Sequence, residues 1–138
     1  ASKIVWLDAY ITNIDRTFKN TNLLMWHKEL WVIDNGASLY FHHSWMNFEK
    51  HALSPFAYIK DHVLLSQATM LDEADQFAKS VLTDEVLQGI VELIPLDWLN
   101  WDDTDDSPEQ IKEVYFNFFK TRRDHSVNFV NEAKNARK

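Results

Sequence analysis

The sequence contains no cysteine and only two glycines among its 138 residues. Without cysteine, the chain cannot form disulfide scaffolds, thiolate metal sites or thiol nucleophiles. Gly36 and Gly89 lie far apart, whereas a loop that binds phosphate through backbone N–H groups needs several glycines close together. The chain therefore contains neither a Walker-type loop nor a dinucleotide-binding fingerprint.

Positive charge is also scarce, because 14 Lys and Arg residues face 21 Asp and Glu residues and the net charge is -7. Such a chain repels a phosphate backbone unless a local basic stripe overrides the net charge. The densest basic cluster is only Lys120, Arg122 and Arg123. No apolar run approaches the roughly 18–20 residues of a membrane span, and the N-terminus shows no signal-peptide pattern. We therefore expect a cytoplasmic protein with no nucleic-acid partner and no membrane span.

Apolar side chains are abundant, at 46% of the chain, which suffices for the core of a single domain covering residues 1–138. Their spacing predicts helices over about 3–12, from Val63 to Ala78, from the Thr83 cap to Ile94, and from Pro108 to about Asn135. Residues 37–60 are expected to form an ordered, aromatic-rich connection, and the acidic run 102–106 a solvated linker. The predicted fold class is mainly α, or α+β with one small β-hairpin.

The hairpin is predicted from two short apolar runs, Leu23 to Trp26 and Leu30 to Ile33, separated by residues 27–29. A polar loop, residues 14–22, precedes the first run, and the turn sequence Asp34-Asn35-Gly36 follows the second. The hairpin folds the chain back on itself, so it brings Asp34 near Asn20. His27 is expected in solvent at the hairpin tip.

Asp15, Asn20 and Asp34 form a set of residues suited to phosphoryl transfer. That reaction needs a carboxylate that orients or deprotonates the acceptor hydroxyl, and hard oxygen ligands for magnesium on the nucleotide phosphates. Asp15 could face the acceptor while Asn20 and Asp34 share one metal ion.

The same residues carry a resemblance to a known family. The segment Thr12-Asn13-Ile14-Asp15-Arg16 through Asn20-Thr21-Asn22 resembles the catalytic loop of HipA-like kinases and of type II phosphatidylinositol 4-kinases. The segment Trp31-Val32-Ile33-Asp34-Asn35-Gly36 is similar to their metal-binding Asp-x-Gly element, and residues 37–43 and 55–62 resemble small bacterial HipA-like proteins. The likeness extends from about Ile4 to Leu99. It implies a protein-kinase-like C-terminal lobe in which Asp15 is the catalytic base and Asn20 and Asp34 hold Mg²⁺ and bind ATP.

The chain departs from the family pattern in one large respect. These kinases also have an N-terminal lobe with a strand lysine and a phosphate-covering loop, and only three residues precede the first predicted helix. We therefore expect the C-terminal lobe of a longer HipA-like kinase, inactive without its N-terminal lobe. The implied reaction is Mg²⁺-dependent transfer of the ATP γ-phosphoryl group to a hydroxyl, on protein Ser or Thr rather than on a lipid.

Simpler interpretations stay open for each residue. Asp15 could pair with Arg16 on the surface or cap the loop, Asn20 and Asn22 could cap backbone groups, and Asp34 could be a turn residue. The whole chain could be a non-catalytic, kinase-like module that binds a protein partner, or a metal-dependent hydrolase that uses the same carboxylates. We expect structural or surface roles for His51, His62 and His125.

Overall fold

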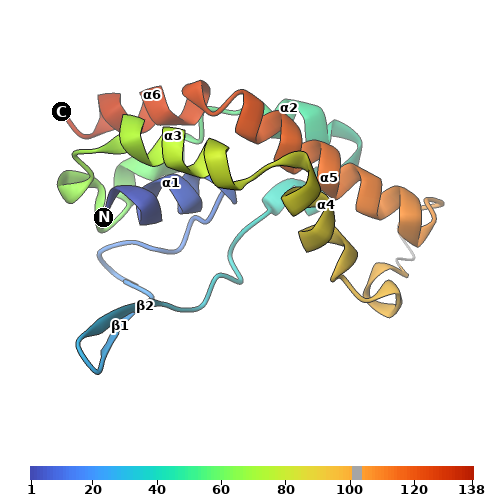
Figure 1. Ribbon diagram of the computed structural model, residues 1–138, viewed down its shortest axis with the longest axis horizontal. Coiled ribbons are helices and arrows are strands. Elements are labelled where there is room, and N and C mark those ends of the chain that lie inside the picture. Colours follow the sequence, from blue (N-terminus) through green and yellow to red (C-terminus); the bar gives the residue numbers. More distant parts are fainter. Residues whose placement is uncertain (101–103) are drawn as a thin grey trace.

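The computed structural model describes residues 1–100 and 104–138, and the side chains of all of these except 42–44. Six α-helices and one β-hairpin are found there (Figure 1). The helices are α1 (Ser2–Tyr10), α2 (Phe48–Ala52), α3 (Leu71–Val81), α4 (Asp84–Glu92), α5 (Pro108–Asp124) and α6 (Val127–Ala136), and the strands are β1 (Leu23–Trp26) and β2 (Glu29–Val32). Short 3₁₀ turns span Tyr40–Asn47, Ala57–Asp61, Leu65–Gln67 and Leu96–Leu99. The expected mainly helical fold with one small hairpin is confirmed.

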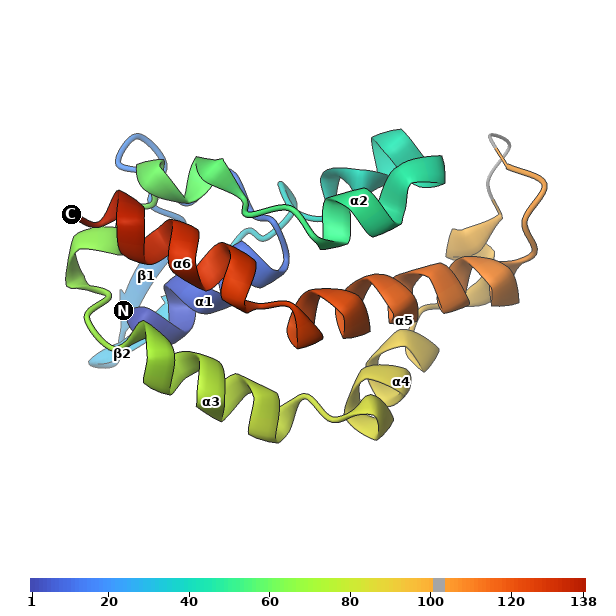
Figure 2. The same ribbon diagram turned by 90° about the horizontal axis from the view of Figure 1, so that it is seen from above.

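Two hydrophobic cores hold the helices together. The first lies between α1, α3 and α6, where the Trp6 ring stacks on Tyr10 at 4.9 Å and meets Phe129 edge-on at 5.4 Å. The second joins α5 to α2, α4 and the turn at 40–47, and its centre is Phe41 stacked on Phe118 at 4.2 Å. In Figure 2, α5 and α6 follow one another along the molecule, with α3 and α4 on one side and α2 on the other.

The two helix starts that the sequence marks most clearly are confirmed. The Thr83 hydroxyl accepts a hydrogen bond from the N–H of Val86 at the start of α4. At the start of α5, Ser107 before Pro108 and Gln110 after it form a reciprocal capping box. Each cap satisfies backbone N–H groups that have no partner inside the helix.

The predicted long final helix was wrong, because the chain breaks at His125 and Ser126 into α5 and α6. Because of the break, α5 and α6 can each pack against different neighbours. Arg122, in the last turn of α5, donates hydrogen bonds to five backbone carbonyls, which belong to Ala9, Tyr10, His51, Ala52 and Ser54. α6 then turns so that Phe129 packs under the same guanidinium, 4.9 Å from its ring centre.

The helix expected from Val63 also begins later, at Leu71. The N–H of Val63 donates to the carbonyl of Arg16, and His62 forms a β-bridge with Thr17. Residues 62 and 63 are thus tied to the loop at residues 16–17, with His62 in an extended conformation, and a separate 3₁₀ turn, Leu65–Gln67, comes before the helix. The connection 37–60 is ordered, as expected, and more helical than expected. Of the predicted acidic linker, residues 102 and 103 lie outside the described residues.

Across the described part of the chain, no helix is long and apolar enough to cross a bilayer.

Candidate functional site around Asp15 and Asp34

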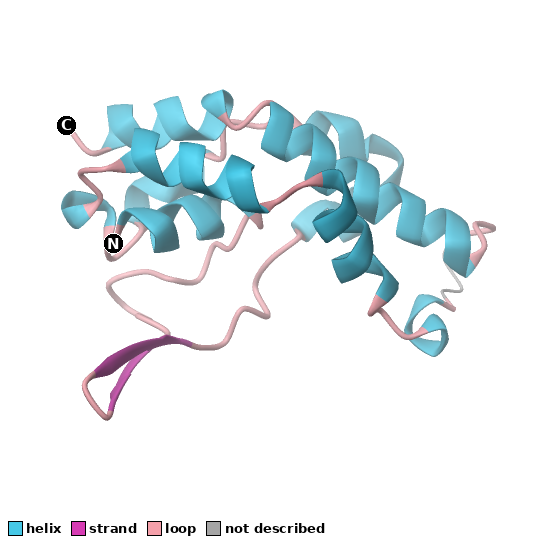
Figure 3. Cartoon of the chain, in the orientation of Figure 1, coloured by secondary structure: helices cyan, strands magenta, loops and turns pink. Residues whose placement is uncertain are grey.

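The hairpin brings the residues that follow β2 back beside those that precede β1, as predicted. Its strands pair antiparallel, with Leu23 opposite Val32 and Trp26 opposite Glu29, and the N–H of Ile33 donates to the carbonyl of Asn22. His27 and Lys28 form the tip with φ values of 48° and 68°, the left-handed pair that a type I′ turn requires. The hairpin stands apart from the helices on two loops (Figure 3). The loop at Asp15–Asn22 thus meets the turn at Asp34–Gly36 at its base.

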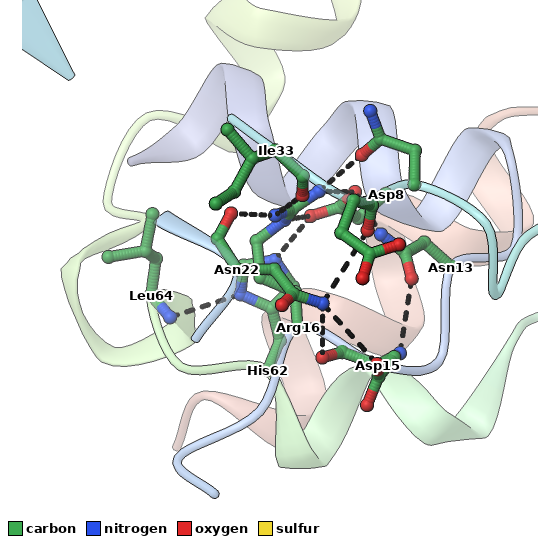
Figure 4. Close-up of polar contacts among 10 residues, drawn as sticks. Asp8, Asn13, Asp15, Arg16, Asn22, Ile33, His62 and Leu64 are labelled. Carbon is green, nitrogen blue, oxygen red and sulfur yellow. Dashed lines mark hydrogen bonds and ion pairs between the residues drawn. The ribbon is translucent and has the colours of Figure 1, made fainter. Parts of the chain in front are cut away.

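Arg16 lies at that base and binds both loops. Its Nε donates to Asp8 Oδ2 at 2.6 Å, and neither side chain is exposed. Its Nη1 donates to the carbonyls of Asn22 and Ile33, and its Nη2 donates to Oδ1 of Asn35 (Figure 4). The predicted alternative of a surface pair between Asp15 and Arg16 is therefore wrong, because the guanidinium points inward to Asp8.

Asp8 is the buried anion that balances Arg16. It also accepts hydrogen bonds from His62 Nε2 at 2.8 Å and from the Asn13 amide at 3.0 Å. Nδ1 of His62 accepts the N–H of Leu64, which fixes the orientation of the ring. Burial raises the pKa of the Asp8 carboxyl, but the hydrogen bonds from His62, Arg16 and Asn13 together lower it by more than burial raises it. The pKa of Asp8 therefore lies below its ordinary value.

The predicted site residues lie on the outer side of this network. The half-buried Asp15 accepts the side-chain N–H of Asn20 at 2.8 Å and that of Asn22 at 3.3 Å, both on Oδ2. The Asn22 amide also lies 3.5 Å from the carbonyl oxygen of Asp34. Asp34 has a φ of 49°, and its exposed carboxylate accepts the N–H of Gly36 at 3.4 Å.

The structure thus brings Asp15, Asn20 and Asn22 into direct contact and links them to the backbone of Asp34. It gives the two asparagines different tasks. Asn22 is buried and its amide spans the two loops, whereas Asn20 is exposed and its Oδ1 accepts no hydrogen bond from the described residues. Asn20 therefore has an oxygen to offer a ligand, and Asn22 has a structural role.

The exposed oxygens of Asn20 and Asp34 are of the hard type that Mg²⁺ prefers. Mg²⁺ is held in such sites by one or two carboxylates and by substrate oxygens rather than by a complete protein cage. Asp34 and Asn20 present hard oxygens at the surface, and the described residues contain no cluster of three or more His, Cys, Asp or Glu side chains that could hold a metal alone. Two such donors would leave most of the six positions around Mg²⁺ to water or to a substrate.

One face of the hairpin next to these residues is apolar and exposed. Leu24, Trp26, Trp31 and Ile33 line a shallow hollow of about 290 Å³ there. The strand register explains it, because Leu24 lies opposite Trp31 and residues two apart share a face. A planar apolar group can stack on this face.

Sequence reasoning missed Asp8. A signal for Asp8 was present, since it is a carboxylate within an apolar helix, and a buried carboxylate requires a partner. The structural role expected for His62 is confirmed, but nothing local marked Asp8 as its partner, because the two residues lie 54 positions apart along the chain.

Comparisons with protein-family models, with curated proteins and with solved structures found no match for this chain.

Proposed function

We propose that this chain forms the catalytic-loop lobe of a HipA-like kinase, which transfers the γ-phosphoryl group of ATP to a hydroxyl in a Mg²⁺-dependent reaction. The observation that carries the proposal is the contact of Asp15 with Asn20 and Asn22, next to Asp34, at the base of one hairpin. Asn22 thereby links the two ends of the hairpin, through Asp15 on one loop and the backbone of Asp34 on the other.

Asp15 acts as the base in this proposal. Its Oδ2 is held by two amides, which fix the carboxylate in one orientation. The described residues place no hydrogen-bond donor on Oδ1, so this oxygen can accept the proton of a substrate hydroxyl. Positioning of this kind is the main contribution that a protein makes to phosphoryl transfer.

Asn20 and Asp34 hold the nucleotide-bound metal in the proposal, since both side chains are exposed and carry hard oxygens. Mg²⁺ would supply neutralisation of the charge that develops on the phosphate oxygens. The apolar face with Trp31 and Leu24 provides a surface for the adenine ring.

The proposal assigns half of a nucleotide site to these residues. With two glycines in the sequence, the chain has no glycine-rich loop to cover phosphates, so that loop and its lysine would come from another segment. A protein hydroxyl is the favoured acceptor, because a chain of net charge -7 is repelled by anionic membrane surfaces.

The proposal is tested by a phosphoryl-transfer assay on the full-length protein, as encoded by the reading frame that contains these residues. We expect Asp15→Asn to lower the single-turnover rate by about 100-fold or more, the usual size of a general-base contribution. Asp61→Asn is the matched control, because Asp61 is exposed and lies in a separate 3₁₀ turn. An unchanged rate in Asp15→Asn would exclude Asp15 as the base.

Metal binding gives a second readout that needs no acceptor. Mn²⁺ with ATP should broaden the NMR signals of Asn20 and Asp34 in the complete protein, and Asp34→Asn should abolish the broadening. If the wild-type protein shows neither broadening nor transfer, the non-catalytic binding module is the better description of this fold.

A further inference from the structure

One asparagine of the sequence is followed directly by glycine, and the structure leaves this pair open to solvent. Asn35 and Gly36 are both exposed and lie in the loop after β2, outside the helices and strands (Figure 3). Every other asparagine of the chain precedes a residue with a side chain. A glycine has no Cβ to shield its own backbone nitrogen, so the nitrogen of Gly36 can approach the side chain of Asn35.

The reaction open to such a pair is the loss of ammonia from the asparagine side chain. The backbone nitrogen of Gly36 attacks Cγ of Asn35, its proton passes through solvent to Nδ2, and Nδ2 leaves as ammonia. The new N–Cγ bond replaces the broken Cγ–Nδ2 bond and closes a cyclic imide. Water then opens the imide at one of its two carbonyls. Opening at Cγ gives aspartate, whereas opening at the backbone carbonyl gives isoaspartate, in which the main chain runs through the former side chain.

Few contacts restrain the two nitrogen atoms that react. The N–H of Gly36 meets only Oδ1 of Asp34 among the described residues, at 3.4 Å, which is long for a hydrogen bond of this type. Nδ2 of Asn35 donates to none of the residues that the structure describes, and the side chain is exposed. The attacking nitrogen is therefore weakly held, and ammonia can leave directly into solvent.

The oxygen of the Asn35 side chain, in contrast, is held by a positive charge. Nη2 of Arg16 donates to Oδ1 of Asn35 at 2.5 Å, and this guanidinium is itself buried against Asp8. A cationic donor on a carbonyl oxygen stabilises the negative charge that develops there when a nucleophile adds to the carbon. Arg16 therefore activates Cγ of Asn35, first toward the nitrogen of Gly36 and then toward water.

We propose that Asn35 is a self-modifying site, which the folded chain converts to aspartate through a cyclic imide with Gly36. Arg16 selects the product, because the imide oxygen on Cγ keeps its bond to the guanidinium and water adds at that carbon. The backbone carbonyl of Asn35 accepts no hydrogen bond from the described residues, so it lacks this activation. Aspartate is therefore the main product and isoaspartate the minor one.

The conversion changes the charge at the base of the hairpin. The new carboxylate accepts the bond from Arg16 as an ion pair, and charge-assisted bonds are roughly twice as strong as neutral ones. It also places a second carboxylate next to Asp34. The inference goes beyond phosphoryl transfer, since the conversion needs neither ATP nor Mg²⁺, and its test does not depend on that activity.

Peptide mapping by mass spectrometry tests the proposal on the 138-residue chain, incubated at neutral pH and physiological temperature. We expect the acid to appear at Asn35 before any other asparagine, including Asn20, which is exposed but precedes Thr21. Electron-transfer fragmentation should show more aspartate than isoaspartate. A synthetic peptide of residues 30–40, which lacks Arg16, should give mainly isoaspartate.

Three outcomes would overturn the proposal. The first is an unchanged Asn35 after the time in which the peptide is fully converted. The second is conversion of Asn20 at the same rate as Asn35. The third is an excess of isoaspartate in the folded chain, which would show that Arg16 does not direct the opening of the imide.

A matched pair of glycine variants checks the mechanism. Gly36→Ala should slow the conversion by about tenfold or more, a rise of about 1.4 kcal/mol in the barrier, because a Cβ hinders the attacking nitrogen. That Cβ would meet only Oδ1 of Asp34, at an ordinary 3.5 Å, so the loop can keep its shape. Gly89→Ala in α4 adds a Cβ that meets nothing within 4 Å and should leave the rate unchanged. Equal rates in the two variants would refute attack by Gly36.

Discussion

Replacing Asp8 by alanine leaves the guanidinium of Arg16 buried without its counter-charge. Both side chains are fully buried, and the bond between them is 2.6 Å long. Removing one partner of such a pair costs about 3–5 kcal/mol, because the remaining charge cannot reach water. The free energy of unfolding of a domain is only about 5–15 kcal/mol, so this single change should remove a large part of it.

Urea unfolding of the 138-residue chain, followed by tryptophan fluorescence, measures the loss. With an m value of about 2 kcal/mol/M, we expect the midpoint of Asp8→Ala to fall by about 1.5–2.5 M. The control is Asp72→Ala, which breaks the exposed pair with Lys134 at 2.7 Å and should cost at most about 1 kcal/mol. If the two variants shift the midpoint equally, Asp8 and Arg16 do not form the buried, coupled pair described above.

Acid and buried cations give two further tests. The folded-state pKa of Asp8 lies below its ordinary 3.8, so its contribution to stability is present above that value and is lost as the pH falls through the lower, folded-state pKa. Asp8→Asn should therefore flatten the acid limb of a plot of unfolding free energy against pH. Parallel plots for the variant and the wild type would contradict this. Arg122→Lys should cost about 3 kcal/mol or more, because an ammonium with three N–H donors cannot replace six guanidinium hydrogen bonds, each with a net worth of about 1.5–3 kcal/mol. Thermal unfolding measures this loss, Arg137→Lys on the surface is the control, and equal melting temperatures would refute the role of Arg122.

The elements that sequence predicted correctly are those whose causes are local. The hairpin follows from two apolar runs and a turn, and the starts of α4 and α5 follow from the caps at Thr83 and Ser107. The errors arose where distant contacts decide. The helix break near Ser126 comes where Arg122 reaches α1, and the late start of α3 follows the pairing of residues 62 and 63 with the distant loop at residues 16–17.

The candidate site divides along the same line. The order of Asp15, Asn20 and Asp34 around a hairpin predicted that they would approach one another, because a hairpin joins its own ends. Sequence could not show that the Asn22 amide would span the two loops. It also could not show that Asp8 would bind Arg16 in the interior and would itself be bound by His62. Those contacts depend on how α1 and the segment at residue 62 pack, which local pattern does not specify.

Arg16 joins the hairpin to the helical body, and these two parts of the protein are stabilised by different kinds of contact. The buried residues of both hydrophobic cores, as far as the structure describes them, come from the helices and their connections and include none from β1 or β2. The hairpin is instead fixed at its base, where Arg16 binds the carbonyls of Asn22 and Ile33. Loss of these two bonds would therefore loosen the hairpin, and Asp34 with it, while the helical body keeps its packing. The orientation of the metal-binding side of the proposed site relative to Asp15 thus depends on the guanidinium of Arg16 together with the Asn22 amide, which bonds to both loops.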